Sequence, residues 1–241
     1  MVPASLSAVT GFNVRARRMV PHPPVNWAER DRLFTQGKKM AWATGARQNL
    51  PMEPVTLTTE RLVLRAPGPQ DTDAVYAACQ DPDIQRWTTI PSPYHPEHAR
   101  GFTEQMVPDG WANDSMFTFG LFLPAGDLVG MIGVTMISLG AGELGFWATK
   151  EFRGRGYTTE ASLAVARWAF TERAIDRLEW RAEAGHTASR AVADRAGFTM
   201  EGTLRSAVTN KGVRRDCWIA SLLPSDLGLP STAPYLPAQT A

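Results

Sequence analysis

The stretch Phe152-Arg153-Gly154-Arg155-Gly156-Tyr157-Thr158-Thr159-Glu160-Ala161 is the most informative part of this 241-residue chain. It lies between a predicted strand and a predicted long helix. Its two glycines let the backbone turn tightly and come close to a ligand. The helix start offers unpaired N–H groups and the positive end of the helix dipole, and the two arginines add charge. The stretch therefore predicts an anion site, and a pyrophosphate is the anion that fits it best.

Two common nucleotide-binding motifs do not fit this stretch. Thr159 stands where the dinucleotide pattern requires its third glycine, and no Gly-Lys-Ser/Thr of a Walker A loop is present. On this segment alone, a glycine-rich loop that merely begins a helix remains the alternative.

A family resemblance emerges from the spacing within the stretch. Arg153-x-x-Gly156-x-Thr158 resembles the Arg/Gln-x-x-Gly-x-Gly/Ala acetyl-CoA motif of the GNAT acetyltransferases, with Thr158 in place of the usual final Gly or Ala. The segment before it, Glu143-Leu144-Gly145-Phe146-Trp147, resembles the splayed fourth strand of that family.

Motifs farther from the stretch extend the resemblance over about residues 56–227. His186-Thr187-Ala188-Ser189 followed by Ala196-Gly197-Phe198 resembles the Asn-x-x-Ser…Gly-Phe signature of the family. Two further segments resemble the RimJ/RimL branch, which acetylates protein N-termini: Asp81-Pro82…Trp87, and Gly202-Thr203-Leu204-Arg205 followed by Asp216.

Hydrophobic periodicity gives the order of the secondary-structure elements. It predicts strands at 61–65, 116–123, 128–138, 143–149, 177–183, 203–208 and 213–222, and helices at 70–80, 95–106, 157–173 and 187–196. This order indicates a mixed α/β domain rather than a doubly wound sheet. The resemblance implies the GNAT acyl-CoA N-acyltransferase fold, with a central, mostly antiparallel sheet, a splayed fourth strand and flanking helices.

The resemblance implies acetyl-CoA as co-substrate and assigns residues to it. The fourth strand of the family pairs its main chain with the thioester arm, and the loop amides and side chains hold the pyrophosphate. His186 stands where the family usually has asparagine, and we expect it to hold the pantetheine or cap the helix. The expected acetyl-CoA residues are Phe146, Trp147, Ala148, Arg153, Gly154, Arg155, Gly156, Tyr157, Thr158, Thr159 and His186.

Acetyl transfer to an amine needs a base and a proton donor. Strand alternation puts Glu143, Gly145 and Trp147 on one face, and Glu143 is the expected base, acting through water. Ser189 is the expected donor to the leaving thiolate, because the RimJ/RimL branch has a serine at this position. Ala193 stands where many family members carry a tyrosine, which excludes a tyrosine donor there. Each residue also has a purely structural alternative. Glu143 would then be a solvated carboxylate at a strand end, and Ser189 a hydroxyl that bonds the backbone of its helix.

The acceptor side is expected to involve Asp81–Pro93, the second helix and the turn at 209–212. Trp87 is expected to line the acceptor pocket, and Asp216 is expected either to bind the ammonium or to pair with Arg205 across a hairpin. The acceptor is a protein N-terminus or a small-molecule amine, because substrate choice depends on loops rather than on the fold.

Composition limits the remaining possibilities. Residues 1–51 carry eight Lys/Arg and two Asp/Glu, a net charge of +6, whereas the rest carries 17 Lys/Arg and 22 Asp/Glu, a net charge of −5. The mildly acidic remainder favours a cationic acceptor over a nucleic acid. No apolar run approaches the length of a membrane span, and Cys79 and Cys217 are expected as free thiols of a cytoplasmic protein.

The domain boundaries follow from this asymmetry. We expect a basic extension at 1–51, a catalytic domain at 52–228 and a tail at 229–241. The extension is a flexible or loosely docked arm, an upstream translation start before Met52, or an arm that binds a specific partner or a nucleic acid. A homodimer is compatible with the resemblance, and no metal is implied. The competing function is a non-catalytic acyl-CoA-binding or regulatory module, since His186 and Ala193 depart from the family pattern.

Overall fold

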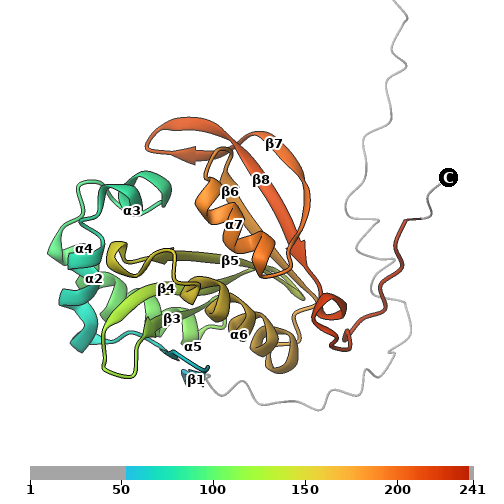
Figure 1. The fold of residues 1–241 in the computed structure, drawn as a ribbon, viewed down its shortest axis with the longest axis horizontal. Coiled ribbons are helices and arrows are strands. Elements are labelled where there is room, and N and C mark those ends of the chain that lie inside the picture. The colour runs from blue at the N-terminus through green and yellow to red at the C-terminus, as the bar shows by residue number, and fades with distance from the viewer. Residues whose placement is uncertain (1–52, 239–241) are drawn as a thin grey trace, which may run out of the picture. The chain divides into compact units, whose positions relative to one another are not determined.

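One eight-stranded sheet organises residues 53–238, which are the residues that the computed structural model describes (Figure 1). The strand order is β1-β2-β3-β4-β5-β6-β8-β7, and every neighbouring pair is antiparallel except β5 and β6. The strands are β1 (Leu57–Thr58), β2 (Val63–Arg65), β3 (Met116–Phe122), β4 (Leu128–Ser138), β5 (Ala141–Ala148), β6 (Arg177–Glu183), β7 (Thr199–Asn210) and β8 (Val213–Leu222). The expected mixed, mostly antiparallel fold is confirmed.

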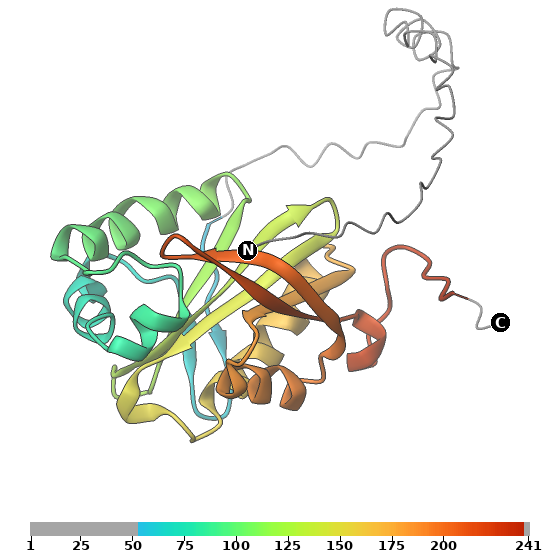
Figure 2. The ribbon, with the colours of Figure 1, turned by 90° about the horizontal axis from the view of Figure 1, so that it is seen from above.

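Helices lie on both sides of the sheet. Figure 2 shows the run from α4 to α5 on one side, and α6 with α7 on the other. The helices are α2 (Thr72–Ala78), α3 (Pro82–Trp87), α4 (Pro96–Gly101), α5 (Val107–Ala112), α6 (Tyr157–Glu172) and α7 (Thr187–Arg195). Short helical turns add η1 (Pro69–Asp71), η2 (Phe102–Met106), η3 (Lys150–Phe152) and η4 (Pro224–Leu227).

The apolar stripe of α6 anchors the larger part of the core. Ala161, Val165 and Trp168 repeat at helical spacing and are buried against the sheet. The Trp168 ring meets the rings of Phe117 and Phe119 edge-on, each at 5.3 Å between centroids. Because this stripe fixes α6 against β3 and β4, it also fixes where the helix begins, at the end of the glycine-rich loop.

A smaller core lies under α2, α3 and α4. Val75, Ile84 and Ala99 pack there with Met131 of β4. Cys79 is buried in the same cluster, and burial raises the pKa of its thiol to about 12. This cluster positions α3 beside the glycine-rich loop.

Two helical segments differ from the sequence expectation. The helix predicted at 70–80 ends at Ala78. The segment Asp81-Pro82-Asp83 begins a further helix, α3, because the Asp81 carboxylate accepts the Asp83 N–H at 2.9 Å and proline suits the first helical turn. The helix predicted at 95–106 continues through a π-helical turn to Ala112. Periodicity missed both features because short caps and a π-turn leave no repeating apolar pattern.

The last two strands form a long hairpin. Lys211 and Gly212 make its two-residue turn, both with positive φ (49° and 77°), as a type I′ turn requires. β7 spans twelve residues, six more than the predicted 203–208, and its register against β8 shifts near Gly202 and again between Leu204 and Val208. The shifts interrupt the polar–apolar alternation, and this explains why the strand was predicted too short.

The parallel pairing of β5 with β6 is short. Ala141, Gly142 and Glu143 are opposite Arg177, Leu178 and Glu179, and the pairing stops there. β5 continues to Ala148 beside β4, and β6 continues to Glu183 beside β8. The two strands therefore diverge beyond Glu143, which confirms the expected splay.

The expected extension at 1–51 lies outside the described residues. At the other end, the expected tail is tied to the domain where it begins, since Leu229 packs on the core and the Thr232 N–H donates to Asp176 at 2.7 Å. No helix within residues 53–238 is long and apolar enough to span a membrane.

Replacement of Gly130 by alanine tests the packing of β4 against β5. A Cβ at Gly130 would lie 2.5 Å from the Trp147 carbonyl oxygen, which is backbone and cannot move aside. We expect Gly130→Ala to lower the free energy of unfolding by about 1–3 kcal/mol in urea denaturation. Gly145→Ala is the matched control, because nothing lies within 4 Å of its Cβ position. Equal stability of the two variants would contradict this packing.

Candidate active site

The glycine-rich loop leads from η3 into α6. Gly154 and Gly156 both have positive φ (75° and 80°), and Gly156 is the residue that caps α6. Within the described residues, the backbone amides from Gly154 to Thr159 donate to no protein acceptor. A shallow hollow beside the loop is lined by Thr59, Glu60, Arg61, Gly156, Thr159, Glu160, Leu163 and Arg195. The loop therefore presents unused donors and the helix dipole to an anion.

The side chains of the loop fall into two groups. Arg155 is exposed, forms no ion pair with the described residues, and lies 5.4 Å from the Phe152 ring centroid. Tyr157 and Thr158 are half-buried, and the Thr158 carbonyl accepts the Ser162 hydroxyl at 2.8 Å. Arg155 is thus the loop cation that is available to a phosphate.

Arg153 is engaged elsewhere. Its guanidinium bonds the carboxylate of Asp81, pairs with Asp83 at 3.0 Å, and donates to the Ala148 carbonyl at 3.1 Å. The sequence predicted Arg153 as a phosphate ligand, whereas the structure uses it to tie the loop to the start of α3. The residue belongs to the predicted site, but its charge is already neutralised by carboxylates.

The free edge of β5 lies next to the loop. Beyond Glu143 this strand is paired only with β4, so the side facing β6 keeps main-chain groups available for an extended ligand. Phe146 points toward the core under α6, and Trp147 packs on the cluster under α2 to α4. Phe146, Trp147 and Ala148 therefore contribute backbone to the opening that the divergence of β5 from β6 leaves between these strands.

Glu143 lies at the point where the strands diverge. Burial raises the pKa of its carboxyl; the Arg181 guanidinium, whose Nε is 3.8 Å away, lowers it, and Glu179 adds to the rise. Arg181 is itself held by Glu179 at 2.7 Å. The net effect is a pKa above the ordinary glutamate value, which suits a group that must take up a proton near neutral pH.

Ser189 lies in the first turn of α7 and is half-buried. Its oxygen accepts the Trp180 indole N–H at 3.1 Å. Because the indole occupies a lone pair and not the hydroxyl hydrogen, Ser189 can still donate a hydrogen bond. The hydroxyl is therefore not used to cap the backbone of its own helix.

His186 and Trp87 stack on each other, with ring centroids 4.3 Å apart and an angle of 16° between planes. Burial, followed by the charge of Arg86, lowers the pKa of His186 below its ordinary value. The imidazole is therefore neutral at pH 7. Residues predicted on the acetyl-CoA side and on the acceptor side thus share one aromatic contact.

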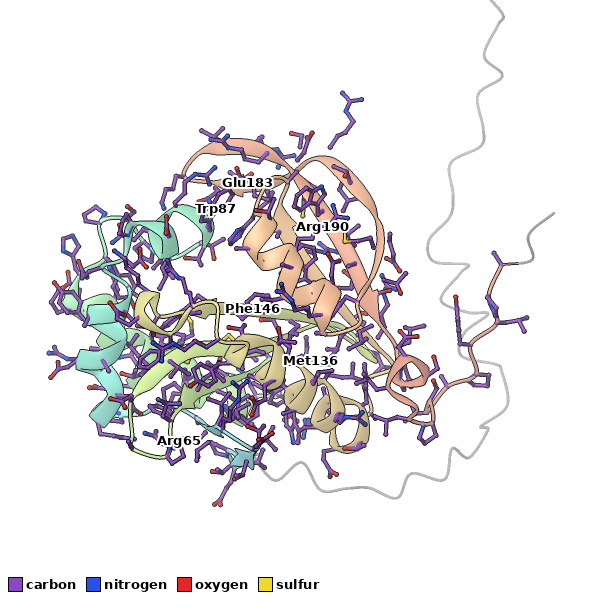
Figure 3. The ribbon with its side chains drawn as sticks, viewed as in Figure 1. Arg65, Trp87, Met136, Phe146, Glu183 and Arg190 are labelled. Carbon is purple, nitrogen blue, oxygen red and sulfur yellow. The ribbon has the colours of Figure 1, made fainter. Side chains whose placement is uncertain are left out.

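α3 is tied to the β6 side of the opening as well as to the loop. Arg86 bonds both carboxylate oxygens of Glu183, at 2.6 and 2.9 Å, and Figure 3 places Trp87 and Glu183 close together above Phe146. In the β7–β8 turn, Asn210 donates to the Arg86 carbonyl at 3.0 Å, and the Lys211 ammonium bonds the Gln85 carbonyl. α3 therefore spans the wide end of the opening.

The expected pair of Arg205 with Asp216 does not form. The Asp216 carboxylate instead accepts the Ser206 N–H at 2.8 Å, inside the bulge of β7. Asp216 is exposed and stabilises the hairpin.

Sequence reasoning did not single out four residues of the site as individual side chains: Arg61, Glu160, Arg86 and Glu183. Each forms an ion pair with a residue about a hundred positions away. Neither local spacing nor periodicity reports such pairs. Two signals were available: Glu160 lies within the decisive stretch, and Arg86 lies within the segment 81–93 expected on the acceptor side.

A family model described as an acetyltransferase (GNAT) domain matches residues 61–199. The chain is 33% identical over 134 residues to "Putative ribosomal N-acetyltransferase YdaF" of Bacillus subtilis (strain 168), covering 54% of this chain and 73% of that protein. It is 29% identical over 171 residues to "Uncharacterized N-acetyltransferase p20" of Bacillus licheniformis, covering 70% and 96%.

Solved structures share the fold. One described as "Probable acetyltransferase" aligns with a TM-score of 0.64 at 27% identity, covering 71% of this chain and 98% of that one. RimL, described as a ribosomal L7/L12 α-N-protein acetyltransferase in complex with coenzyme A, aligns with a TM-score of 0.65 at 20% identity, covering 71% and 98%. At 20% identity the second likeness concerns the fold.

Replacement of Arg86 tests the environment of His186. Because the Arg86 charge lowers the His186 pKa, Arg86→Gln should raise it, and the Glu183 carboxylate, which keeps Arg215 at 3.7 Å as an ion-pair partner, continues to favour the charged imidazole. The measurement is NMR titration of the histidine ring protons. Arg100→Gln is the control, since Arg100 is exposed and does not act on His186. A His186 pKa that stays the same or falls in Arg86→Gln would contradict the assignment.

Proposed function

The chain belongs to the GNAT acetyltransferase family, in its RimJ/RimL-like branch, and we propose that it moves the acetyl group of acetyl-CoA to a protein N-terminal amine by direct attack. The observation that carries the proposal is the junction of β5 with α6. There a free strand edge lies beside a loop whose amides are unused. A pyrophosphate joined to an amide-containing arm matches these two features in order.

The loop and β5 do the binding. Amides from Gly154 to Thr159, together with the Arg155 guanidinium, hold the pyrophosphate. The main chain of Phe146, Trp147 and Ala148 pairs with the pantetheine arm. Binding on both features fixes the thioester at the divergence point of β5 and β6, so that the reacting carbon is presented to an amine that enters from the opposite face.

Glu143 is the proposed base. Its carboxylate shares a face with Gly145 and Trp147, and the empty space beside Gly145 leaves room for water. Through such a water, Glu143 takes the proton that an ammonium must lose before it can attack. The raised pKa of Glu143 makes it a better base than an exposed glutamate.

Ser189 is the proposed donor to the departing sulfur. The Trp180 indole fixes the position of the Ser189 oxygen and leaves its hydrogen for the thiolate. The charge that develops on sulfur is then stabilised by a hydrogen-bond donor whose position is already fixed.

A protein N-terminus is the proposed acceptor, and its support is that one relative is named "Putative ribosomal N-acetyltransferase YdaF". The acceptor would lie against Trp87 and the β7–β8 turn, which α3 brings together. A small-molecule amine is the alternative within the same chemistry.

Two measurements test the proposal. Acetyl-CoA and CoA are titrated calorimetrically into the full-length protein, and transfer is then assayed on peptides with free N-termini, on the same peptides with blocked N-termini, and on small amines. The proposal predicts binding, and transfer only to free-N-terminus peptides. Binding without transfer to any acceptor would favour the non-catalytic acyl-CoA module. Transfer to small amines alone would overturn the acceptor class.

Glu143→Gln should lower kcat by about a hundredfold, since a positioned base contributes on this order. In the wild type, activity should be lost as pH falls through the raised Glu143 pKa, because the base must be ionised. Arg181→Gln should move this acid limb to higher pH, because Arg181 lowers that pKa. Glu97→Gln, on the exposed face of α4, is the control. An acid limb unmoved by Arg181→Gln would show that another group titrates.

Ser189→Ala should lower kcat by about tenfold, consistent with the loss of one hydrogen bond to a charged group, with little change in the KM for acetyl-CoA. Thr187→Ala, in the same helical turn and exposed, is the matched control. A wild-type rate in Ser189→Ala would remove the serine from the mechanism.

A further inference from the structure

One arginine joins the first strands of the sheet to the glycine-rich loop. Arg61, just before β2, donates from its Nε to Glu160 of α6 at 2.6 Å, and its backbone N–H donates to the other carboxylate oxygen at 3.0 Å. Thr59 donates its hydroxyl to that same oxygen at 2.6 Å. The turn between β1 and β2 is therefore bound to the first turn of α6 through a single carboxylate.

The same guanidinium reaches the loop itself. Arg61 Nη1 donates to the Arg155 carbonyl at 3.0 Å, and the guanidinium carbon of Arg61 lies 4.7 Å from the Tyr157 ring centroid. Because the Arg155 carbonyl oxygen points toward Arg61, it cannot turn toward the anion site. The peptide that joins Arg155 to Gly156 is planar, so the Gly156 amide must point to the opposite side, away from Arg61.

The carboxylate partner is kept ionised. Burial alone would raise the pKa of Glu160, but hydrogen bonds from Thr59 and Arg61 outweigh it and hold that pKa below the ordinary glutamate value. Arg61 therefore has a permanent anionic anchor, and its charge is already neutralised within the protein. A guanidinium suits this position, because its planar fork can serve a carboxylate and a carbonyl at once.

We infer that Arg61 is a positioning residue for the glycine-rich loop: anchored on Glu160, it fixes the Arg155 carbonyl and so aims the loop amides at the anion. The inference rests on the proposed function for the identity of that anion, the pyrophosphate of acetyl-CoA. Arg61 acts through the loop, so it governs affinity for acetyl-CoA and not the chemical step.

The experiment compares four variants with the wild type. Arg61→Ala removes the whole device, Arg61→Lys keeps the charge without the fork, and Glu160→Gln keeps Arg61 but weakens its anchor. Arg167→Ala is the matched control. Arg167 is an exposed arginine of α6, the helix that carries Glu160, and it bonds the Leu227 carbonyl at 3.4 Å, away from the loop. The readouts are calorimetric Kd for acetyl-CoA and for CoA, kcat and KM, and amide hydrogen exchange of residues 154–160 without ligand.

We expect Arg61→Ala and Glu160→Gln each to raise Kd and the KM for acetyl-CoA by about tenfold, the order expected for one lost charge-assisted hydrogen bond. The kcat at saturation should stay within about twofold, and loop amides should exchange faster. Arg61→Lys should not recover wild-type affinity, and Arg167→Ala should match the wild type throughout.

Several results would overturn the inference. Full recovery in Arg61→Lys would mean that charge alone suffices. Wild-type or tighter binding in Glu160→Gln would mean that Arg61 contacts the phosphate directly. Unchanged exchange in Arg61→Ala would mean that the loop is ordered without it. If the wild type binds neither acetyl-CoA nor CoA, the proposed function fails, and the exchange measurement still decides whether Arg61 orders the loop.

Discussion

The early divergence of β5 from β6 is the constraint on which the rest of the structure depends. Parallel pairing ends at Glu143, and a buried strand edge left without partners would be costly. The molecule manages this in two ways. α3 bridges the wide end of the opening through Arg153 on one side and Arg86 on the other. The loop and the strand edge inside the opening keep their donors for a ligand, so the unpaired backbone becomes the binding surface.

Much of this arrangement could be predicted from the sequence, because it depends on local pattern. The glycines of the decisive stretch and the apolar stripe of α6 are local features, and the anion loop and the mixed α/β class were predicted from such patterns, whereas the splay of β5 was implied by the family resemblance of residues 143–147. α3 and the fate of Arg153 could not be predicted in this way. A helix of six residues has no period to read, and an arginine in a phosphate motif carries no sign that carboxylates 70 or more positions away will take it.

The same distinction between local pattern and long-range contacts applies to the candidate site. The anion loop was predicted from its glycines and arginines, Glu143 was proposed as the base with strand alternation placing it, and Ser189 was proposed from the family resemblance. Their partners Arg181, Trp180 and Arg61 lie on other strands or turns and came only from the structure. For Asp216, the sequence suggested a partner that the structure does not show. Pairing with Arg205 was inferred from an unbroken hairpin. The register shift in β7 instead brings the Asp216 carboxylate to the Ser206 amide.

The irregularity of β7 has one further consequence. β7 is the last strand of the sheet and is mostly exposed, so its outer main chain resembles an open template for other strands. A straight strand of twelve residues in that place would invite aggregation through edge-to-edge pairing. The kinks at Gly202 and at Ser206, where φ is +157° and +54°, break the template into short pieces. The hairpin can therefore be long enough to reach α3 and still resist edge-to-edge pairing with strands of other molecules.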